Sequence, residues 1–261
     1  MRNRAVLTTV IGALLVMVSP QFAGAQYIGA NSSTWNNPGS ALMSVMIQNS
    51  INRQMLEKSL KARQQGAATN TQGAQAGSAQ SAQQAQLTPA EMRSRLTFSP
   101  ANRNVAVEEL AKTIGDTAEN RAQLVPIFQQ YLKAFDDQAK TDRADRYDLG
   151  RAAAFFVLVN YVAATGKEAN DAQANETEKK FRTTLASSNA FAKMSNAQRQ
   201  QLYEYLVVLG TLPLAGATQA QQSGNKKEEA AYRQLASALV KTLFGIQVDQ
   251  MTLTSSGLTM P

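Results

Sequence analysis

The chain has 261 residues, of which 44% are apolar, and it carries a formal net charge of +7. It contains neither cysteine nor histidine, which excludes disulfides, thiolate chemistry, Ser-His-Asp or Cys-His catalysis and a typical zinc site. Most of the positive charge lies before residue 88, since the body that follows has 20 basic against 18 acidic residues. Because nucleic acid requires a concentrated basic face, we expect no nucleic-acid binding.

The first 25 residues have the order of parts that is typical of a secretory signal peptide. Arg2 and Arg4 precede an apolar run over residues 5–18, and residues 23–25 (Ala-Gly-Ala) supply a small-residue cleavage site. The run is short for a bilayer span, so a cleaved signal is favoured over a membrane anchor. We expect removal of residues 1–25, export to the periplasm or the exterior, and no stable membrane insertion of the mature chain. The absence of disulfides favours a bacterial source.

Residues 26–65 are predicted to form a leader and a methionine-rich helix that begins at about Ser40. The apolar side chains of this helix fall on two opposed faces, which suits packing between neighbours or self-association better than binding to a membrane surface. Residues 66–86 contain no charged, aromatic or large apolar side chain, so they are predicted to be a flexible linker. Residues 40–65 are therefore a candidate segment for a protein partner or for self-association, and an ordinary core helix is the alternative.

Residues 87–261 are predicted to form one all-α domain, either bundle-like or orthogonal, because apolar side chains recur at three and four positions. The helix that begins at Asp148 is apolar nearly all round, as is typical of the centre of a bundle. Pro126 and Pro213 are expected to break or bend their helices. Essentially no sheet is expected, and residues 246–261 are predicted to be irregular or weakly extended. Start signals predict helices from Pro89, Ser99 (to Ile114), Thr117 (to Lys140), Asp148 (to Thr165), Asp171, Ser195 and Asn225 (to Gly245).

Several polar groupings match parts of known sites, but each has an ordinary explanation. Ser223 and Lys226 have the Ser-x-x-Lys spacing of some serine acylases, yet they fall in a predicted turn. The five aspartates within residues 136–148 lack the spacing of an EF-hand loop and alternate with basic residues, which favours ion pairs. The pairs at residues 108–109 and 228–229 (Glu-Glu) lie near helix starts or on polar faces. We expect no catalytic, cofactor-binding or metal-binding site in these groupings.

Two polar residues in otherwise apolar helices are less ordinary. Glu204 lies between Tyr203 and Tyr205, and a buried glutamate that keeps its proton is the acid that glycan cleavage requires. A partly buried, hydrogen-bonded glutamate is the commoner case. Asn160 lies in an apolar run, where its amide must find partners. We expect Asn160 to fix helix register, with a role in lining a ligand cavity as the alternative.

Three short motifs in the second half of the chain form a familiar pattern. They are Leu-Thr-Phe-Ser-Pro at residues 96–100 with Arg103, Tyr-Asp-Leu-Gly-Arg-Ala-Ala-Ala-Phe-Phe at residues 147–156, and Leu-Phe-Gly-Ile at residues 243–246. This pattern resembles a family of exported bacterial helical proteins that is defined as a domain of unknown function. The resemblance covers roughly residues 96–261, with earlier residues expected to lie outside it. It implies export and a helical body, and it supplies no activity or catalytic residues.

The function is predicted from the expected export of the chain and from its lack of the histidine and cysteine residues that many catalytic sites require. The first hypothesis is a non-catalytic envelope or secreted protein that binds another macromolecule. The second is an enzyme that cleaves cell-wall glycan with the single carboxyl group of Glu204. The third is a carrier of a small apolar ligand, held in a cavity around Phe155, Asn160 and Tyr203.

Overall fold

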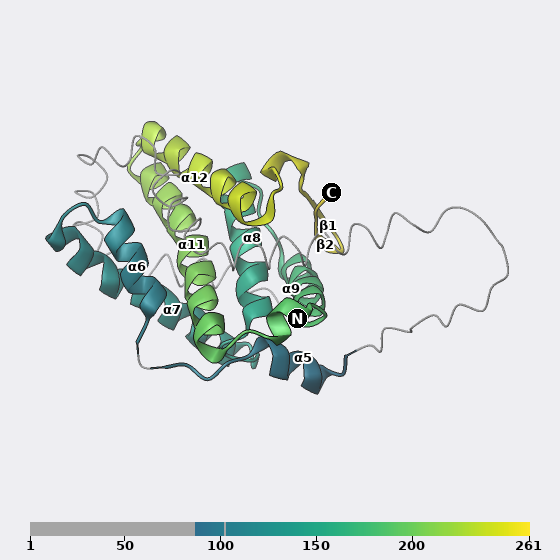
Figure 1. Ribbon diagram of the computed structural model, residues 1–261. Helices are drawn as coiled ribbons and strands as arrows, with labels where there is room; N and C mark the ends of the chain where they lie inside the picture. Colours follow the sequence, from purple (N-terminus) through teal and green to yellow (C-terminus); the bar gives the residue numbers. More distant parts are fainter. Residues whose placement is uncertain (1–86, 102) are drawn as a thin grey trace.

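The computed structural model describes residues 87–101 and 103–261 (Figure 1). The predicted signal peptide, the methionine-rich helix at residues 40–65 and the linker at residues 66–86 lie outside the described residues. The part that is described is mainly helical, which confirms the predicted all-α class. None of the helices in this part is both long enough and apolar enough to cross a membrane.

The apolar helix predicted for the centre of the domain does lie there. Helix α8 is buried on almost every side, and Asp148 caps its start by accepting a hydrogen bond from the backbone N–H of Arg151 at 2.8 Å. Gly166, with φ of +70°, ends it in the left-handed conformation that favours glycine. Three helices contact α8 and enclose it (Figure 1). The four ranges are α8 (Leu149–Thr165), α9 (Asp171–Ala186), α11 (Asn196–Gln222) and α12 (Lys226–Phe244).

The remaining helices cover the flanks of this central group. Helices α6 (Val105–Ile114) and α7 (Ala118–Thr141) pack on each other and on α11. Helix α5 (Pro89–Leu96) begins at the predicted residue, where Thr88 and Glu91 form a capping box, and it contacts α9. The short helix α10 (Asn189–Ala192), which was not predicted, connects α9 to α11. One continuous apolar core runs through these elements.

The C-terminal tail adds a small hairpin to this helical body. After the 3-10 turn η2 (Val248–Gln250), strands β1 (Thr252–Thr254) and β2 (Gly257–Thr259) pair antiparallel. The backbone N–H of Leu258 donates to the Thr177 hydroxyl of α9 at 2.8 Å. The hairpin is therefore attached to α9, and it is the small exception to the expected absence of sheet.

The helix predicted to begin at Ser99 begins instead at Val105. The segment before it is held in a non-helical conformation by the side chain of Gln200 on α11. The backbone N–H of Ala101 donates to Gln200 Oε1 at 2.7 Å, and Gln200 Nε2 donates to the carbonyl of Arg103 at 3.0 Å. A tertiary contact thus overrides the local Ser-Pro start signal.

The expected breaks at the two prolines are absent from the structure, because both helices continue past them. Pro126 lies inside α7, which continues to Thr141, and Pro213 lies inside α11, which continues to Gln222. Pro126 is exposed, so water can satisfy the carbonyl that lacks a helical donor. Pro213 is buried, and its effect on the helix is compensated by a side chain from a neighbouring helix, as described below.

Candidate binding pocket

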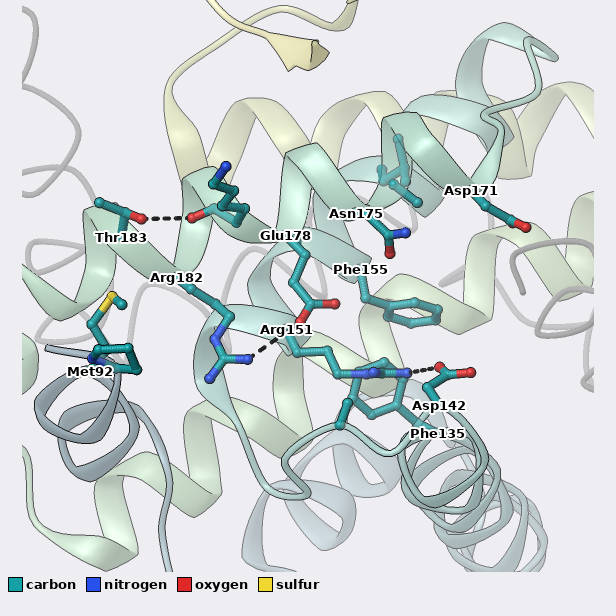
Figure 2. Close-up of a pocket in the computed structure, with 16 residues that line it drawn as sticks. Met92, Phe135, Asp142, Arg151, Phe155, Asp171, Asn175, Glu178, Arg182 and Thr183 are labelled. Carbon is teal, nitrogen blue, oxygen red and sulfur yellow. Dashed lines mark hydrogen bonds and ion pairs between the residues drawn. The ribbon is translucent and has the colours of Figure 1, made fainter. Parts of the chain in front are cut away.

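A pocket of about 600 Å³ lies between α5, the end of α7, α8 and α9 (Figure 2). Its volume falls within the range of about 300–1,000 Å³ that is usual for ligand sites. The apolar part of its lining includes Phe135 of α7 and Ala154, Phe155 and Leu158 of α8. Charged side chains from α8, α9 and the end of α7 complete the lining, so the pocket combines an apolar surface with a polar one.

One wall of the pocket is formed by the connection between α7 and α8. The chain turns there through two non-glycine residues in the left-handed region, Arg143 with φ of 55° and Tyr147 with φ of 56°. This turn leaves Asp142 at the end of α7 and Asp148 at the start of α8. The sequence between them thereby brings several carboxylates close to the arginines of α8 and α9.

Asp142 and Arg151 form the best-defined ion pair in the pocket. Arg151 Nη2 lies 2.6 Å from Asp142 Oδ2, and the two side chains are only 11% and 13% exposed. The guanidinium of Arg151 also lies over the ring of Phe135, 5.6 Å from its centroid. Arg151 is therefore held in place from two sides.

Arg182 of α9 is shared among three carboxylates. Its Nη2 lies 3.0 Å from Asp145 and 3.1 Å from the fully buried carboxylate of Asp148. Its Nη1 lies 3.7 Å from Glu178, one helical turn earlier. Asp145 pairs in addition with the exposed Arg93 of α5 at 3.0 Å.

Among the carboxylates that pair with Arg151 and Arg182, that of Glu178 has the longest pairing distance. Its side chain is 26% exposed, and Figure 2 shows it pointing from α9 into the pocket, with Arg151 and Phe155 nearby. Burial raises the pKa of its carboxyl, Arg151 opposes that rise, and the negative charge of Asp148 adds to it. Ionised Glu178 thus lies in a place where solvent stabilises it poorly.

Sequence reasoning did not identify Glu178. It lies in a polar helix, and the spacing between Glu178 and Arg182 is that of an ordinary solvated pair on a helix surface. Only the packing of α9 against α8, together with the turn after α7, makes its surroundings partly apolar. The one sequence feature that pointed to this region was the alternation of aspartate and basic residues within residues 136–148. That feature was attributed to ion pairs, and aspartates of this segment do pair with Arg151 and Arg182.

Glu204, the candidate glycan-cleaving acid, has a different environment. It is 1% exposed and does not line this pocket. Its carboxylate accepts hydrogen bonds from Asn104 Nδ2 at 2.8 Å, Gln200 Nε2 at 2.7 Å and the backbone N–H of Ala106 at 3.0 Å. Burial raises the pKa of Glu204, and these donors oppose the rise. Glu204 of α11 therefore accepts hydrogen bonds from donors at the start of α6, where backbone N–H groups have no partner within the helix.

Asn160 joins α8 to α11, in agreement with its predicted role in register. It is fully buried, and its Nδ2 donates to the carbonyls of Phe156 at 2.8 Å and Leu209 at 3.3 Å. Tyr203 donates to Asp136 at 2.5 Å. Of the three residues expected around an apolar cavity, only Phe155 lines the pocket between α5, α7, α8 and α9.

The side chains of the remaining candidate motifs form hydrogen bonds and ion pairs with residues that are near in the sequence. Ser223 donates to the carbonyl of Ala220 at 3.1 Å, and Lys226 Nζ lies 3.0 Å from Glu229. Glu108 pairs with Arg103. Across residues 87–101 and 103–261, no three acidic side chains are grouped closely enough to hold a metal ion.

The other two paired glutamates also have partners. Glu109 accepts hydrogen bonds from Gln201 Nε2 at 3.1 Å and from the hydroxyl of Tyr205. Glu228 accepts from the side-chain amide of Asn225 at 2.8 Å at the start of α12. Glu109 thus links α6 to α11, whereas Glu228 contacts the residue that caps its own helix.

Comparison with known proteins gives one result. A family model described as "Family of unknown function (DUF6683)" matches residues 5–261. The expectation that the residues before Leu96 lie outside the family is therefore wrong. That expectation arose because the three motifs on which the resemblance was based all lie after residue 95. No curated protein and no solved structure matches the chain.

Proposed function

The chain belongs to this family of unknown function, and on that premise we propose that it is a non-catalytic exported protein that binds another protein through the pocket between α5, α7, α8 and α9. The observation that carries the proposal is the pocket itself, with an apolar surface beside a set of charged side chains. The signal-like order of residues 1–25 supports the exported part of the proposal.

The arrangement of the charges supports binding rather than chemistry. Asp142 pairs with Arg151, and Arg182 pairs with Asp145 and Asp148. Groups held in this way provide a rigid pattern of charge, which orients a partner and selects against wrong ones. General acid–base catalysis requires instead a group whose proton is free to move to a reacting atom.

The composition of the pocket also resembles that of a protein interface. Such interfaces have an apolar centre surrounded by polar side chains. Here Phe155 and Leu158 provide the apolar centre, while Lys179 and Asp171 of α9 are among the polar residues that border it. A partner segment with apolar and charged side chains would match this pattern.

Residues 40–65 remain the second candidate contact segment. They lie outside the described residues, so their part in the proposal rests on their sequence alone. Deletion of residues 26–86 should leave a folded helical body, since the core described above is built from residues after 86. If the segment contributes to binding, the deletion should also abolish capture of a partner, and unchanged capture would remove this segment from the proposal.

A steric test addresses the pocket directly. Ala174 of α9 lines the pocket, whereas Ala172 of the same helix is exposed and does not. Ala174→Trp should fill the pocket and abolish capture of the partner from the native envelope, with Ala172→Trp as the matched control. Equal capture by both variants would show that the pocket is not the binding site.

A further inference from the structure

We propose that the pocket recognises a cationic side chain, a lysine or an arginine, that the partner protein presents next to apolar residues. This inference rests on the proposed function and specifies the chemistry of the group that is bound. It follows from the position of Glu178, from the longer distance of its ion pair and from the apolar surface beside that residue.

The charged side chains that line the pocket are balanced in number, with three acidic and three basic residues. Two of the basic side chains, those of Arg151 and Arg182, form close ion pairs with aspartates of the turn after α7. The six charged lining residues are Asp142, Asp171, Glu178, Arg151, Lys179 and Arg182.

Glu178 lacks an ion pair as close as those of the neighbouring aspartates. Arg151 lies 2.6 Å from Asp142, and Arg182 lies within 3.1 Å of both Asp145 and Asp148, whereas Glu178 is 3.7 Å from Arg182. The two arginines are thus directed mainly at the aspartates, and a cation can approach Glu178 without breaking a close pair.

The environment of Glu178 strengthens its attraction for a cation. Burial raises the pKa of its carboxyl, which means that the ionised form is less well stabilised than it would be in water. A positive charge placed beside it supplies that stabilisation, and it does so more effectively than at an open surface because the effective dielectric is lower. Nearby Asp148 adds negative potential of the same sign.

The apolar lining suits the rest of a lysine or arginine side chain. Both residues have an aliphatic stem that packs on apolar surface while the charged end reaches a polar partner. Phe155 and Leu158 of α8 line the pocket together with Glu178 of α9, and Figure 2 shows Phe155 beside Glu178. The volume of about 600 Å³ accommodates such a side chain together with an apolar neighbour.

Three capped peptides that differ only in charge test the inference on the full chain. They are N-acetyl-Phe-X-Phe-amide with lysine, glutamine or glutamate at X, and their dissociation constants are measured by calorimetry or by NMR titration. The lysine peptide should bind about tenfold more tightly than the glutamine peptide, and the glutamate peptide should bind most weakly. Tightest binding by the glutamate peptide, equal affinities, or the absence of binding by all three would overturn the inference.

A pair of variants on one helix assigns the effect to Glu178. Glu178→Gln should remove the preference for the lysine peptide, and Glu176→Gln, whose residue does not line the pocket, should retain it. Retention of the preference in Glu178→Gln would contradict the inference. If Ala174→Trp abolishes partner capture while the peptides show no preference for lysine, binding through the pocket stands and its cation selectivity is disproved.

Discussion

Asn160 Nδ2 donates a hydrogen bond to the carbonyl of Leu209 at a distance of 3.3 Å. In a regular helix that carbonyl would accept from the backbone N–H of residue 213, but residue 213 is a proline and has no N–H. A buried amide of α8 thus satisfies the carbonyl that Pro213 leaves without a donor in α11. The same contact explains why Asn160 lies in an apolar run and how α11 continues through a buried proline.

A double-mutant cycle measures this relationship. Asn160→Leu should lower the free energy of unfolding by about 1–3 kcal/mol, because it leaves the buried carbonyl of Leu209 without a partner. In a Pro213→Ala background the alanine supplies its own N–H to that carbonyl, so the loss caused by Asn160→Leu should be smaller by about 1 kcal/mol. Urea unfolding of the four proteins gives the values, and additive effects would contradict the proposed link.

The buried carboxylate of Glu204 should support the fold. Glu204→Ala removes the acceptor for Asn104, Gln200 and the backbone N–H of Ala106, so we expect a loss of about 1–3 kcal/mol in the free energy of unfolding. The midpoint of denaturant unfolding, followed by far-UV circular dichroism, measures this loss.

A nearby carboxylate provides the control for Glu204. Glu108 pairs with Arg103, whose side chain is 71% exposed, so Glu108→Ala should change the unfolding midpoint little. An equally small effect of Glu204→Ala would show that its hydrogen bonds do not stabilise α6. Such a result would also reopen the possibility that Glu204 is retained for chemistry.

Glu178 should reduce the stability of the unliganded protein at neutral pH. Burial raises the folded-state pKa of Glu178 above its ordinary value of 4.5. The positive charges of Arg151 and Arg182 lower this pKa, and the negative charges of Asp148 and Asp142 raise it further, but burial is the largest effect. The folded state therefore binds this proton more readily than the unfolded state does. The stability associated with it is fully present below pH 4.5 and is lost as the pH rises through the raised pKa.

Substitution by a neutral isostere tests that sign. Glu178→Gln should have a higher melting temperature than the wild type at pH 7, and the difference should decrease as the pH is lowered towards 4.5. Glu176→Gln serves as the control and should show no such trend. A lower melting temperature of Glu178→Gln at pH 7 would indicate that the ionised carboxylate is already well paired in the empty pocket.

Most of the fold could be predicted from the sequence because local signals agree with the packing. The capping box at Thr88, the cap at Asp148 and the glycine stops at Gly166 and Gly245 mark helix ends that the structure retains. The errors at Ser99 and Pro213 arose where a distant side chain overrides a local signal. Gln200 holds the segment after Ser99 out of the helix, and no sequence pattern relates these two positions.

The pocket could not be predicted in the same way, since it depends on how four helices and the turn between α7 and α8 come together. Residues 142–148 were correctly associated with ion pairs, but the partners of Asp145 and Asp148 include Arg182, more than thirty residues later. Glu178 is a candidate binding residue because Arg151 and Arg182 form closer ion pairs with aspartates than Arg182 forms with Glu178. These distances depend on the three-dimensional arrangement and cannot be deduced from spacing along the chain.

Hydrogen–deuterium exchange of the full chain, with and without the partner captured from its native envelope, locates the binding surface. Protection should be concentrated in α5, in residues 142–151 and in the part of α9 from Asp171 to Thr183, all of which border the pocket. Protection confined to α6 and α12, with no change in α9, would contradict the assignment of this pocket as the binding site.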